Sequence, residues 1–396
     1  CLTNSIELIE YPTNGVVKHL KSRDDWSKVK NKRLQEEIIA TPKKIKKIKN
    51  FQSEKISKNS IVFKDKSIIK VQAGGRKNAL RLLDNFLNKN GKLYLQNISS
   101  PKHSEKYSSR ISPHLTWGSI SSKEIIKKIR IRKENLKIEE KSKWQRNLTA
   151  FQSRLSWRCH FIQKIEDDPL IEISNMHALY ENIRDDGNNN LFFKAWKNGK
   201  TGYPFVDACM RNLTYEGWIT FRMRAMLVSF ASYDLWLDWR FFGHHLAKLF
   251  TDYEPGIHYS QLQMQSGVTG INTLRIYNPV KQSKEHDESG EYIKKWVPEL
   301  KNLTSQWIHE PWKMSQEIQI RLNCEIGKDY SYPIVDHNDA VRIAKQKISK
   351  VQKQKEFKNI AKKVYLKHGS RSNGNRSIFN DRSLKIKKDI KQLSLF

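Results

Sequence analysis

The chain has 396 residues and carries 73 Lys and Arg against 41 Asp and Glu, a formal net charge of +32. This excess of positive charge favours a polyanionic partner, nucleic acid before membrane, although the Lys, Ile and Asn bias of an AT-rich genome is an alternative source for part of it. The four cysteines form no CxxC pair, so neither a zinc ribbon nor a disulfide framework is indicated, and a reducing cytosol suits the chain.

The hydropathy of the chain argues against a membrane protein. The longest apolar tract, near residues 223–239, is interrupted by Arg224, Asp234 and Asp238, and the N-terminus shows no signal peptide. We therefore expect a cytoplasmic monomer without a metal site.

The first 73 residues are heterogeneous. "IELIEYP" predicts a strand and "NGVVKHL" the start of a helix. The Lys-rich stretch that follows, "TPKKIKKIKNFQSEKISKNS", has no clean apolar face and is predicted to be a solvated linker.

Residues 74–312 are predicted to be all-α. "GGRKNALRLLDNFL" places its leucines at helical spacing after a Gly-Gly break. "SSKEIIKKIRIRKENLKIEEKSKW" predicts a second amphipathic helix, with Ser121 as N-cap and Glu124 three positions on. The helical pattern continues in "QRNLTAFQSRLSWRCHFIQKI", "TGYPFVDACMRNL", "GWITFRMRAMLVSFASYDLWL" and "WRFFGHHLAKLF".

Residues 313–396 form a polar, basic C-terminal extension. From residue 341 onward it holds 17 Lys and Arg against three acids, and "HGSRSNGNRS" is predicted to be a disordered hinge.

Two arginine-containing segments could bind anions. In "YSSRIS", residues 107–112, hydroxyls surround Arg110 just before a predicted helix, a composition that can hold a phosphate, although an ordinary Ser-rich turn is the alternative. In "SRLSWRCHFIQKI", Arg154 and Arg158 share one helix face with Trp157 beside them, which suits an anionic aromatic ligand; an exposed, salt-bridged face is the alternative.

The segment "EGWITFRMRAMLVSF", residues 216–230, is predicted to be a helix that is apolar nearly all the way round, apart from Arg222 and Arg224. Two positions along a helix is a rotation of about 200°, so these side chains project from nearly opposite sides. We therefore expect either one solvent-facing and one buried arginine, or two different anions flanking this helix.

The segment 250–283 combines Asp252, Glu254 and His258 with a Gln- and Gly-rich loop that ends in "RIYNP". The alternative for His258 is a core residue whose hydrogen bonds are made within the protein. No HExxH, Walker A, GxSxG or GxGxxG element occurs, so a metalloprotease, a P-loop NTPase, a serine hydrolase and a Rossmann dehydrogenase are not supported.

Four of these stretches together resemble a known family: "SSRISPHLTWGSIS", "WRCHFIQKI", "TGYPFVDACMRNLTYEGWITFRMRAMLVSF" and "RIYNPVKQSKEHDESGEYIKKWVPEL". Over about residues 74–312 the chain resembles the FAD-binding helical domain of the DNA photolyase and cryptochrome family. The resemblance implies an all-α fold with FAD as cofactor. It also implies that residues 1–73 hold the tail of that family's N-terminal α/β antenna domain.

The resemblance implies roles for individual residues. The implied FAD contacts are Tyr94, Ser108, Ser109, Arg110, Ile111, Ser112, Phe151, Arg158, Trp218, Arg224, Asp252, Glu254 and His258. The implied contacts with damaged DNA are Arg154, Trp157 and Arg222. The implied catalytic positions are Arg154, Trp157, Trp239, His258 and Met264.

Several positions depart from the family pattern. Arg154 stands where a glutamate is usual, Met264 where a second pocket tryptophan is usual, and His258 where an asparagine beside the flavin is usual. In the tryptophan chain that reduces the flavin in this family, Trp239 aligns, but Leu262 and Asp186 occupy the inner and outer positions. Trp196, Trp218 or Trp236 are alternative carriers for the electron.

The resemblance implies a blue-light-dependent lyase that splits cyclobutane pyrimidine dimers in DNA by electron transfer from reduced FAD. A cryptochrome-like photoreceptor without repair activity is the main alternative, and a basic nucleic-acid-binding module that has lost its cofactor is the third. The last five residues, "QLSLF", resemble the peptide that bacterial DNA-processing proteins insert into the sliding clamp. This resemblance implies that Gln392, Leu393, Leu395 and Phe396 bind the clamp, with a coincidental apolar terminus as the alternative.

Overall fold

The structure is a computed structural model that describes residues 2–11, 15–20, 22–46, 70–184 and 189–370. Within these ranges it is built from helices and contains no strand, which confirms the predicted all-α class. The α-helices are α1 (Trp26–Gln35), α2 (Arg76–Asn88), α3 (Tyr94–Asn97), α4 (Ser104–Tyr107), α5 (Ser112–Thr116), α6 (Ser122–Glu134), α7 (Ile138–Asp167), α8 (Asn190–Lys197), α9 (Pro204–Glu216), α10 (Phe221–Ser229), α11 (Trp239–Leu249), α12 (Pro255–Gln265), α13 (Pro279–His286), α14 (Glu291–Trp296), α15 (Gln316–Arg321), α16 (His337–Gln352) and α17 (Phe357–His368).

Local sequence explains where several helices begin. Ser121 caps α6 in a capping box with Glu124, as predicted, but the helix ends at Glu134 and α7 starts afresh at Ile138. Gly217 ends α9 in the left-handed conformation, and Thr220 then caps α10, whose first residue is Phe221. The helix predicted over the whole of residues 216–230 therefore begins five residues into that stretch.

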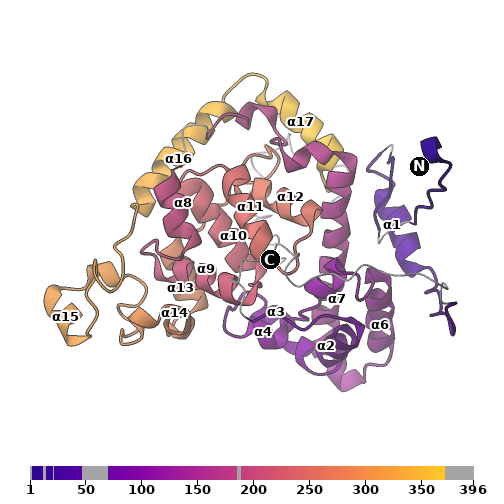
Figure 1. Cartoon of the computed structure of the whole chain (residues 1–396), viewed down its shortest axis with the longest axis horizontal. Helices are drawn as coiled ribbons and strands as arrows, with labels where there is room; N and C mark the ends of the chain where they lie inside the picture. The colour runs from indigo at the N-terminus through magenta and orange to yellow at the C-terminus, as the bar shows by residue number, and fades with distance from the viewer. Residues whose placement is uncertain (1, 12–14, 21, 47–69, 185–188, 371–396) are drawn as a thin grey trace.

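Two hydrophobic cores meet along α7, the 30-residue helix near the middle of Figure 1. The larger core gathers buried side chains of α9 to α12, α14 and α16, such as Met226, Leu246 and Ile348. The smaller core packs α2, α3 and α6 against the first half of α7, around Leu83, Ile125 and Leu148. Because α7 contributes to one core and packs against helices of the other, it sets the distance between them.

The approach of α12 to α7 depends on Gly256. A Cβ atom at this position would lie 2.6 Å from the Cα atom of Ile162 and 3.0 Å from the carbonyl oxygen of Phe161. Real Cβ atoms do not approach backbone this closely, so only glycine allows the two helices to pack at this distance.

The "TGYPFVDACMRNL" stretch has a structural role that its motif did not reveal. Asp207, fully buried on α9, accepts hydrogen bonds from the backbone and hydroxyl of Thr201 at 2.8 and 2.7 Å and from the hydroxyl of Tyr330 at 2.5 Å. This carboxylate ties the turn before α9 to the segment before α16. The contact helps to hold part of the C-terminal region onto the helical domain.

The N-terminal segment differs from the sequence prediction. Residues 5–11 form no strand, and Ile6, Leu8 and Tyr11 are exposed. A strand needs a neighbour for its backbone hydrogen bonds, and none of the described residues supplies one here. The helix predicted at "NGVVKHL" begins later, at Trp26, and α1 packs beside α6 and α7 (Figure 1).

The predicted boundary at residue 312 does not coincide with a boundary in packing. Ala344, Ile348 and Val351 of α16 belong to the larger core, and α16 and α17 arch over its top in Figure 1. The clamp-like residues Gln392–Phe396 lie outside the described residues, so that expectation stays a prediction. Among the helices of the described ranges, none combines the length and apolar character that a membrane span requires.

We predict that Gly256→Ala destabilises the protein by about 1–3 kcal/mol, the usual cost of overpacking, because the new methyl group meets the backbone of α7. The matched control is Gly74→Ala, where a Cβ atom would meet nothing within 4 Å. Denaturant unfolding of both variants measures the difference. Equal stabilities would contradict the close approach of α12 to α7.

Candidate functional site

A cavity of about 350 Å³ lies between α7 on one side and α10, α11 and α12 on the other, at the boundary of the two cores. It is lined by every residue to which the sequence assigned a cofactor role. These are Tyr94, Ser108, Ser109, Arg110, Ile111, Ser112, Phe151, Arg158, Trp218, Arg224, Asp252, Glu254 and His258. Arg154, Trp157 and Arg222, predicted to face DNA, line the same cavity.

The cavity wall carries more positive than negative charge. Five arginines line it, and the acidic residues of the lining are Asp252 and Glu254. A concave site with such an excess of guanidinium groups suits an anionic ligand.

Arg224 is held by Asp252 in a bidentate ion pair. Its two terminal nitrogens donate to the two carboxylate oxygens at 2.9 Å each, and its Nε donates to the carbonyl oxygen of Ile219 at 2.9 Å. The planar group lies 4.2 Å from the ring centroid of Phe250. Arg224 thus faces a carboxylate of the protein itself, and its orientation in the cavity is fixed.

Arg158 is paired only in part. Its Nη2 donates to Glu254 at 3.0 Å, whereas its buried Nη1 has no hydrogen-bond partner. A buried donor without an acceptor costs about 1–3 kcal/mol, more for a charged group. An acceptor from a bound ligand would remove this cost.

Arg110 shows the same feature. Its guanidinium lies 3.9 Å from the ring centroid of Trp218, its Nε donates to Gln72 at 3.1 Å, and its Nη1 is buried without a partner. Trp218 in turn donates from Nε1 to the hydroxyl of Ser112 at 3.3 Å. The predicted phosphate-binding turn therefore contains a guanidinium nitrogen that is available to donate a hydrogen bond to a ligand.

His258 is neutral in this environment. Its Nε2 lies 3.0 Å from the carbonyl oxygen of Gly243, which can only accept, so Nε2 carries the proton and Nδ1 is an acceptor. Burial, with a smaller contribution from the positive charge of Arg224, lowers the pKa of the imidazole from 6.5 to about 4. His258 therefore lines the cavity as a neutral side chain that can form hydrogen bonds.

Trp157 and Arg154 lie next to each other along the wall that α7 contributes. Trp157 is half-buried, and its ring stacks on that of Phe161 at a centroid distance of 5.8 Å. The charge of Arg154 acts on the hydroxyl of Tyr94 and lowers its pKa, against the larger effect of burial, which raises it. The two residues predicted to contact a DNA lesion thus adjoin the predicted cofactor residues.

Two predicted site residues do not line the cavity. Met264 is half-buried on α12 and points away from the face that carries His258 and Leu262. Trp239 is fully buried behind the wall, where its Nε1 donates to Asn175 at 2.7 Å. Asp186, the outer position of the predicted electron chain, lies outside the described residues.

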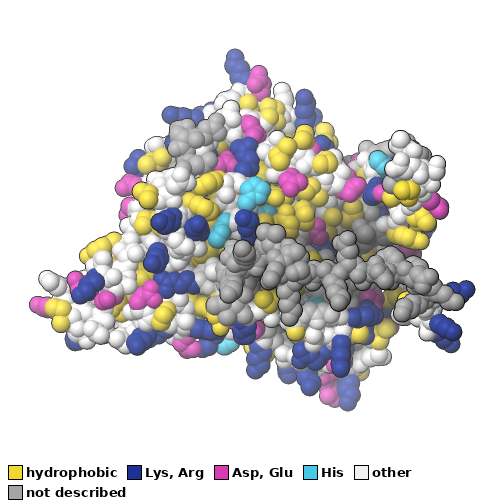
Figure 2. Space-filling view, in the orientation of Figure 1, with side chains coloured by type: hydrophobic (Ala, Val, Ile, Leu, Met, Phe, Trp, Pro, Cys, Tyr) yellow, Lys and Arg dark blue, Asp and Glu magenta, His cyan; other side chains and the backbone are white. Residues whose placement is uncertain are grey.

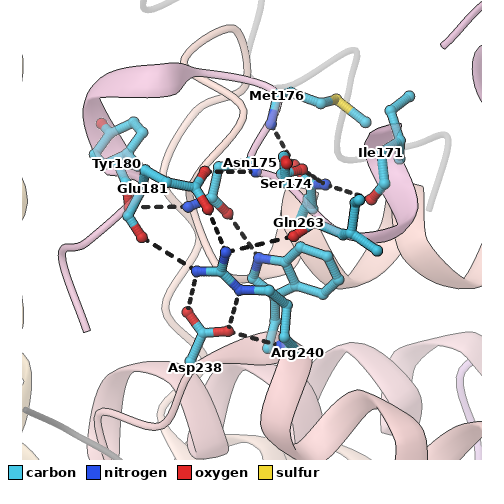
Figure 3. A network of polar contacts seen from close by, with 11 residues as sticks. Ile171, Ser174, Asn175, Met176, Tyr180, Glu181, Asp238, Arg240 and Gln263 are labelled. Carbon is cyan, nitrogen blue, oxygen red and sulfur yellow. Dashed lines mark hydrogen bonds and ion pairs between the residues drawn. The ribbon is translucent and has the colours of Figure 1, made fainter. Parts of the chain in front are cut away.

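Figure 3 shows the polar network that contains Asn175, the hydrogen-bond partner of Trp239. Arg240 pairs with Asp238 and Glu181, while Gln263 donates to the carbonyl oxygens of Ile171 and Ser174 at 2.8 Å. This network fastens the segment 171–181 to α11 and α12. The side chain of Trp239 is therefore held rigidly and shielded from solvent, and its ring centroid lies 6.1 Å from that of Tyr259.

Sequence reasoning missed several residues of the lining: Tyr253, Gln261, Gln265 and Tyr277. Gln261, Leu262 and Gln265 lie three, four and seven positions after His258, so helical spacing could have found them. Gln72, which holds Arg110, lies between the predicted Lys-rich linker and the predicted helical region, and no local pattern marked it.

Comparison with known proteins identifies the family of the chain. A profile described as the FAD binding domain of DNA photolyase matches residues 151–350. The chain belongs to the DNA photolyase and cryptochrome family. It is 35% identical over 271 residues to a deoxyribodipyrimidine photo-lyase of Alkalihalophilus pseudofirmus, and 28% identical over 292 residues to cryptochrome DASH of Synechocystis.

The matches cover 67% and 74% of this chain but 53% and 58% of those relatives, so the chain spans about half their length. Solved structures agree with the fold. A class III photolyase from Agrobacterium tumefaciens matches with a TM-score of 0.63 at 28% identity, covering 71% of this chain and 56% of that one. A Synechocystis cryptochrome matches with a TM-score of 0.63 at 26% identity, covering 71% and 57%.

FAD is the cofactor of this domain. The cavity fits it chemically, because the buried, unpartnered guanidinium nitrogens of Arg110 and Arg158 offer donors to a diphosphate.

We predict that His258 makes the protein less stable in acid. The unfolded chain binds a proton at this residue below pH 6.5, whereas the folded protein binds it only near pH 4, so the free energy of unfolding falls as pH drops through this window. The loss due to His258 amounts to roughly 3 kcal/mol.

The variant His258→Asn removes this titration, and urea unfolding from pH 6.5 down to pH 4 compares the two proteins. We expect a shallower pH dependence for the variant. Parallel losses of stability would show that His258 is not held neutral by burial.

Proposed function

We propose that this chain is the FAD-binding part of a light-dependent DNA repair enzyme that splits cyclobutane pyrimidine dimers. The observation that carries the proposal is the arginine-rich cavity in which buried guanidinium donors lack partners, with Trp157 and Arg154 on the same wall. FAD and a DNA strand with a pyrimidine dimer both carry anionic phosphates and rings with apolar faces. The cavity wall offers guanidinium groups for the phosphates and aromatic side chains for the rings.

When bound, reduced FAD supplies the light-absorbing group and the electron that the chemistry needs. The residues of the chain bind and orient it. Arg110 and Arg158 would donate to the diphosphate, and the ion pair with Asp252 would keep the guanidinium of Arg224 in one orientation at the cavity wall. Neutral His258 would offer Nδ1 as an acceptor without adding a charge.

The basic surface supports the DNA part of the proposal. The net charge is +32, and Lys and Arg side chains are scattered among hydrophobic and neutral ones over the face drawn in Figure 2. Phosphate contacts of this kind supply affinity without sequence preference. A damaged base pair is extruded from the duplex at low cost, because its stacking is already weakened.

Repair is tested by mixing the reduced protein with an oligonucleotide that contains a thymine dimer, in blue light and in darkness. We expect restored thymine only in the light. Equal signals in both conditions would remove the repair activity and leave the photoreceptor.

A photoreceptor without repair activity is the second candidate. Met264 does not reach the cavity, and Leu262 lines it where a tryptophan is usual in the family, so the lesion side and the electron path both differ from the pattern. One relative is named cryptochrome DASH. These features would suit an altered use of the same flavin.

The two arginines of α10 separate cofactor binding from DNA binding. We predict that Arg224→Ala lowers flavin affinity at least about tenfold, because it removes a charge and leaves Asp252 unpaired in the cavity. Arg222→Ala should keep its flavin and weaken DNA binding, with a smaller salt dependence.

Flavin absorbance relative to protein absorbance measures the first effect, and titration with labelled duplex at several salt concentrations measures the second. Circular dichroism checks that both variants are folded. Equal loss of flavin in both variants would show that Arg222 serves the cofactor as well.

A further inference from the structure

A second pocket, of about 190 Å³, lies between α1 and α7. Trp157 lines both this pocket and the cavity described above, so the two sites share one indole ring. None of the described residues that line the second pocket is acidic. Its polar lining is instead made of cations, hydroxyl groups and a histidine.

Lys30 is the buried cation of this pocket. Its side chain is 6% exposed, and its Nζ donates to the hydroxyl of Ser156 at 3.2 Å and lies 5.3 Å from the ring centroid of Trp26. No carboxylate of the described residues lies within 4 Å of this ammonium. Burial lowers its pKa, the expected response of a charge that has lost water and gained no counter-ion.

The backbone holds Lys30 in this position. A Cβ atom at Gly15 would lie 2.1 Å from the Cγ atom of Lys30, so the lysine stem packs directly on the glycine backbone. Trp26 donates from Nε1 to the carbonyl oxygen of Gly15 at 3.0 Å and closes the same side. The ammonium group therefore cannot turn freely to solvent.

Arg23 and His160 complete the cationic wall. The guanidinium of Arg23 donates from Nη2 to Nδ1 of His160 at 2.8 Å and pairs with Asp167 at 3.4 Å. Because His160 accepts at Nδ1, its proton is on Nε2, which makes the ring a donor. The ring meets that of Trp157 edge-on at a centroid distance of 5.4 Å.

A second buried ammonium follows one helical turn after His160. Lys164 is 4% exposed and lies 5.3 Å from the ring centroid of Phe161, with no described carboxylate within 4 Å. Burial lowers its pKa to about 8. A buried ammonium group without a counter-ion costs several kcal/mol. Lys30 lines the pocket, so an anion bound there would offset its cost, whereas Lys164 does not line the pocket.

We propose that this pocket binds the phosphate of a nucleotide. Lys30 and the hydroxyls of Ser153 and Ser156 supply the charge and the donors that a phosphate oxygen accepts, and the indole of Trp157 offers a face for stacking a base. A phosphate is favoured over a carboxylate because several donors converge from two helices on one small volume. This inference goes beyond the proposed function, because it needs neither flavin nor light.

The nucleotide has two possible sources with the same chemistry: a free mononucleotide, or a unit of the DNA strand that carries the lesion. The shared Trp157 would place a strand nucleotide beside a base held in the main cavity. The experiment has one arm for each source, and both are run in darkness.

The test variant is Lys30→Gln and the matched control is Lys28→Gln, an exposed lysine on the same helix. Calorimetric titration with thymidine monophosphate measures the first source. Titration of a labelled, dimer-containing duplex at several salt concentrations measures the second. Flavin content and thermal unfolding check that each variant is intact.

A free nucleotide is supported if thymidine monophosphate binds the unchanged protein and the control but binds Lys30→Gln at least about tenfold more weakly. A strand nucleotide is supported if only the duplex responds, with weaker binding and a salt slope smaller by about 0.9, the value for one lost phosphate contact. If Lys30→Gln matches the control in both titrations, the proposal is wrong.

A second variant covers the case in which Lys30→Gln fails to fold. Ser156→Asp places a carboxylate beside the Lys30 ammonium and occupies the site from within. We expect it to unfold at the same or a higher temperature and to lose phosphate binding. Undiminished binding by a folded Ser156→Asp protein would overturn the proposal.

Discussion

The arrangement of this protein depends on arginine side chains held at the boundary between two hydrophobic cores. Arg158 on α7 reaches across to Glu254 before α12, and Arg224 on α10 pairs with Asp252. A buried guanidinium without a partner is costly, so each pair fixes both the charge and the helices that carry it. Two carboxylates do not balance five arginines, and the remaining donors define a cavity that an anion completes.

The long helix α7 makes this boundary possible. One face packs in the smaller core through residues such as Leu148, and Gly256 lets α12 lie directly against its second half. Phe151, Arg154 and Arg158 then line the cavity, while Ser156 and His160 line the second pocket. A single helix thus serves two concave sites because residues three and four apart share a face, and Trp157 lies where the two faces meet.

Local sequence predicted much of this fold and part of the site. The apolar spacing of residues 76–88 and the capping box at Ser121 depend only on near neighbours, and both are present in the structure. The strand predicted at residues 6–12 was wrong over residues 6–11, the part that the structure describes, because a strand depends on a partner that the local sequence does not contain. Gln72 was missed for a similar reason, since its role comes from a contact with Arg110, 38 positions away.

Helix geometry alone did not predict that Arg222 and Arg224 line the same cavity. A rotation of about 200° separates their Cα–Cβ bonds, yet both side chains line one cavity. Arginine is long enough to bring its charged end several ångströms from the direction of its Cβ atom, and both residues are half-buried at the cavity wall. The helical spacing therefore determined the directions of the two Cα–Cβ bonds but not the positions of the two guanidinium groups.

The departures from the family pattern leave the paired charges of the cavity in place. By the resemblance, Leu262 and Met264 stand where aromatic residues are usual, His258 where an amide is usual and Arg154 where a glutamate is usual. Arg158 and Arg224 nevertheless form their ion pairs with Glu254 and Asp252. Loss of one partner from a buried ion pair costs several kcal/mol, because the other charge is left uncompensated. The paired charges are therefore the feature of the cavity on which the fold itself depends.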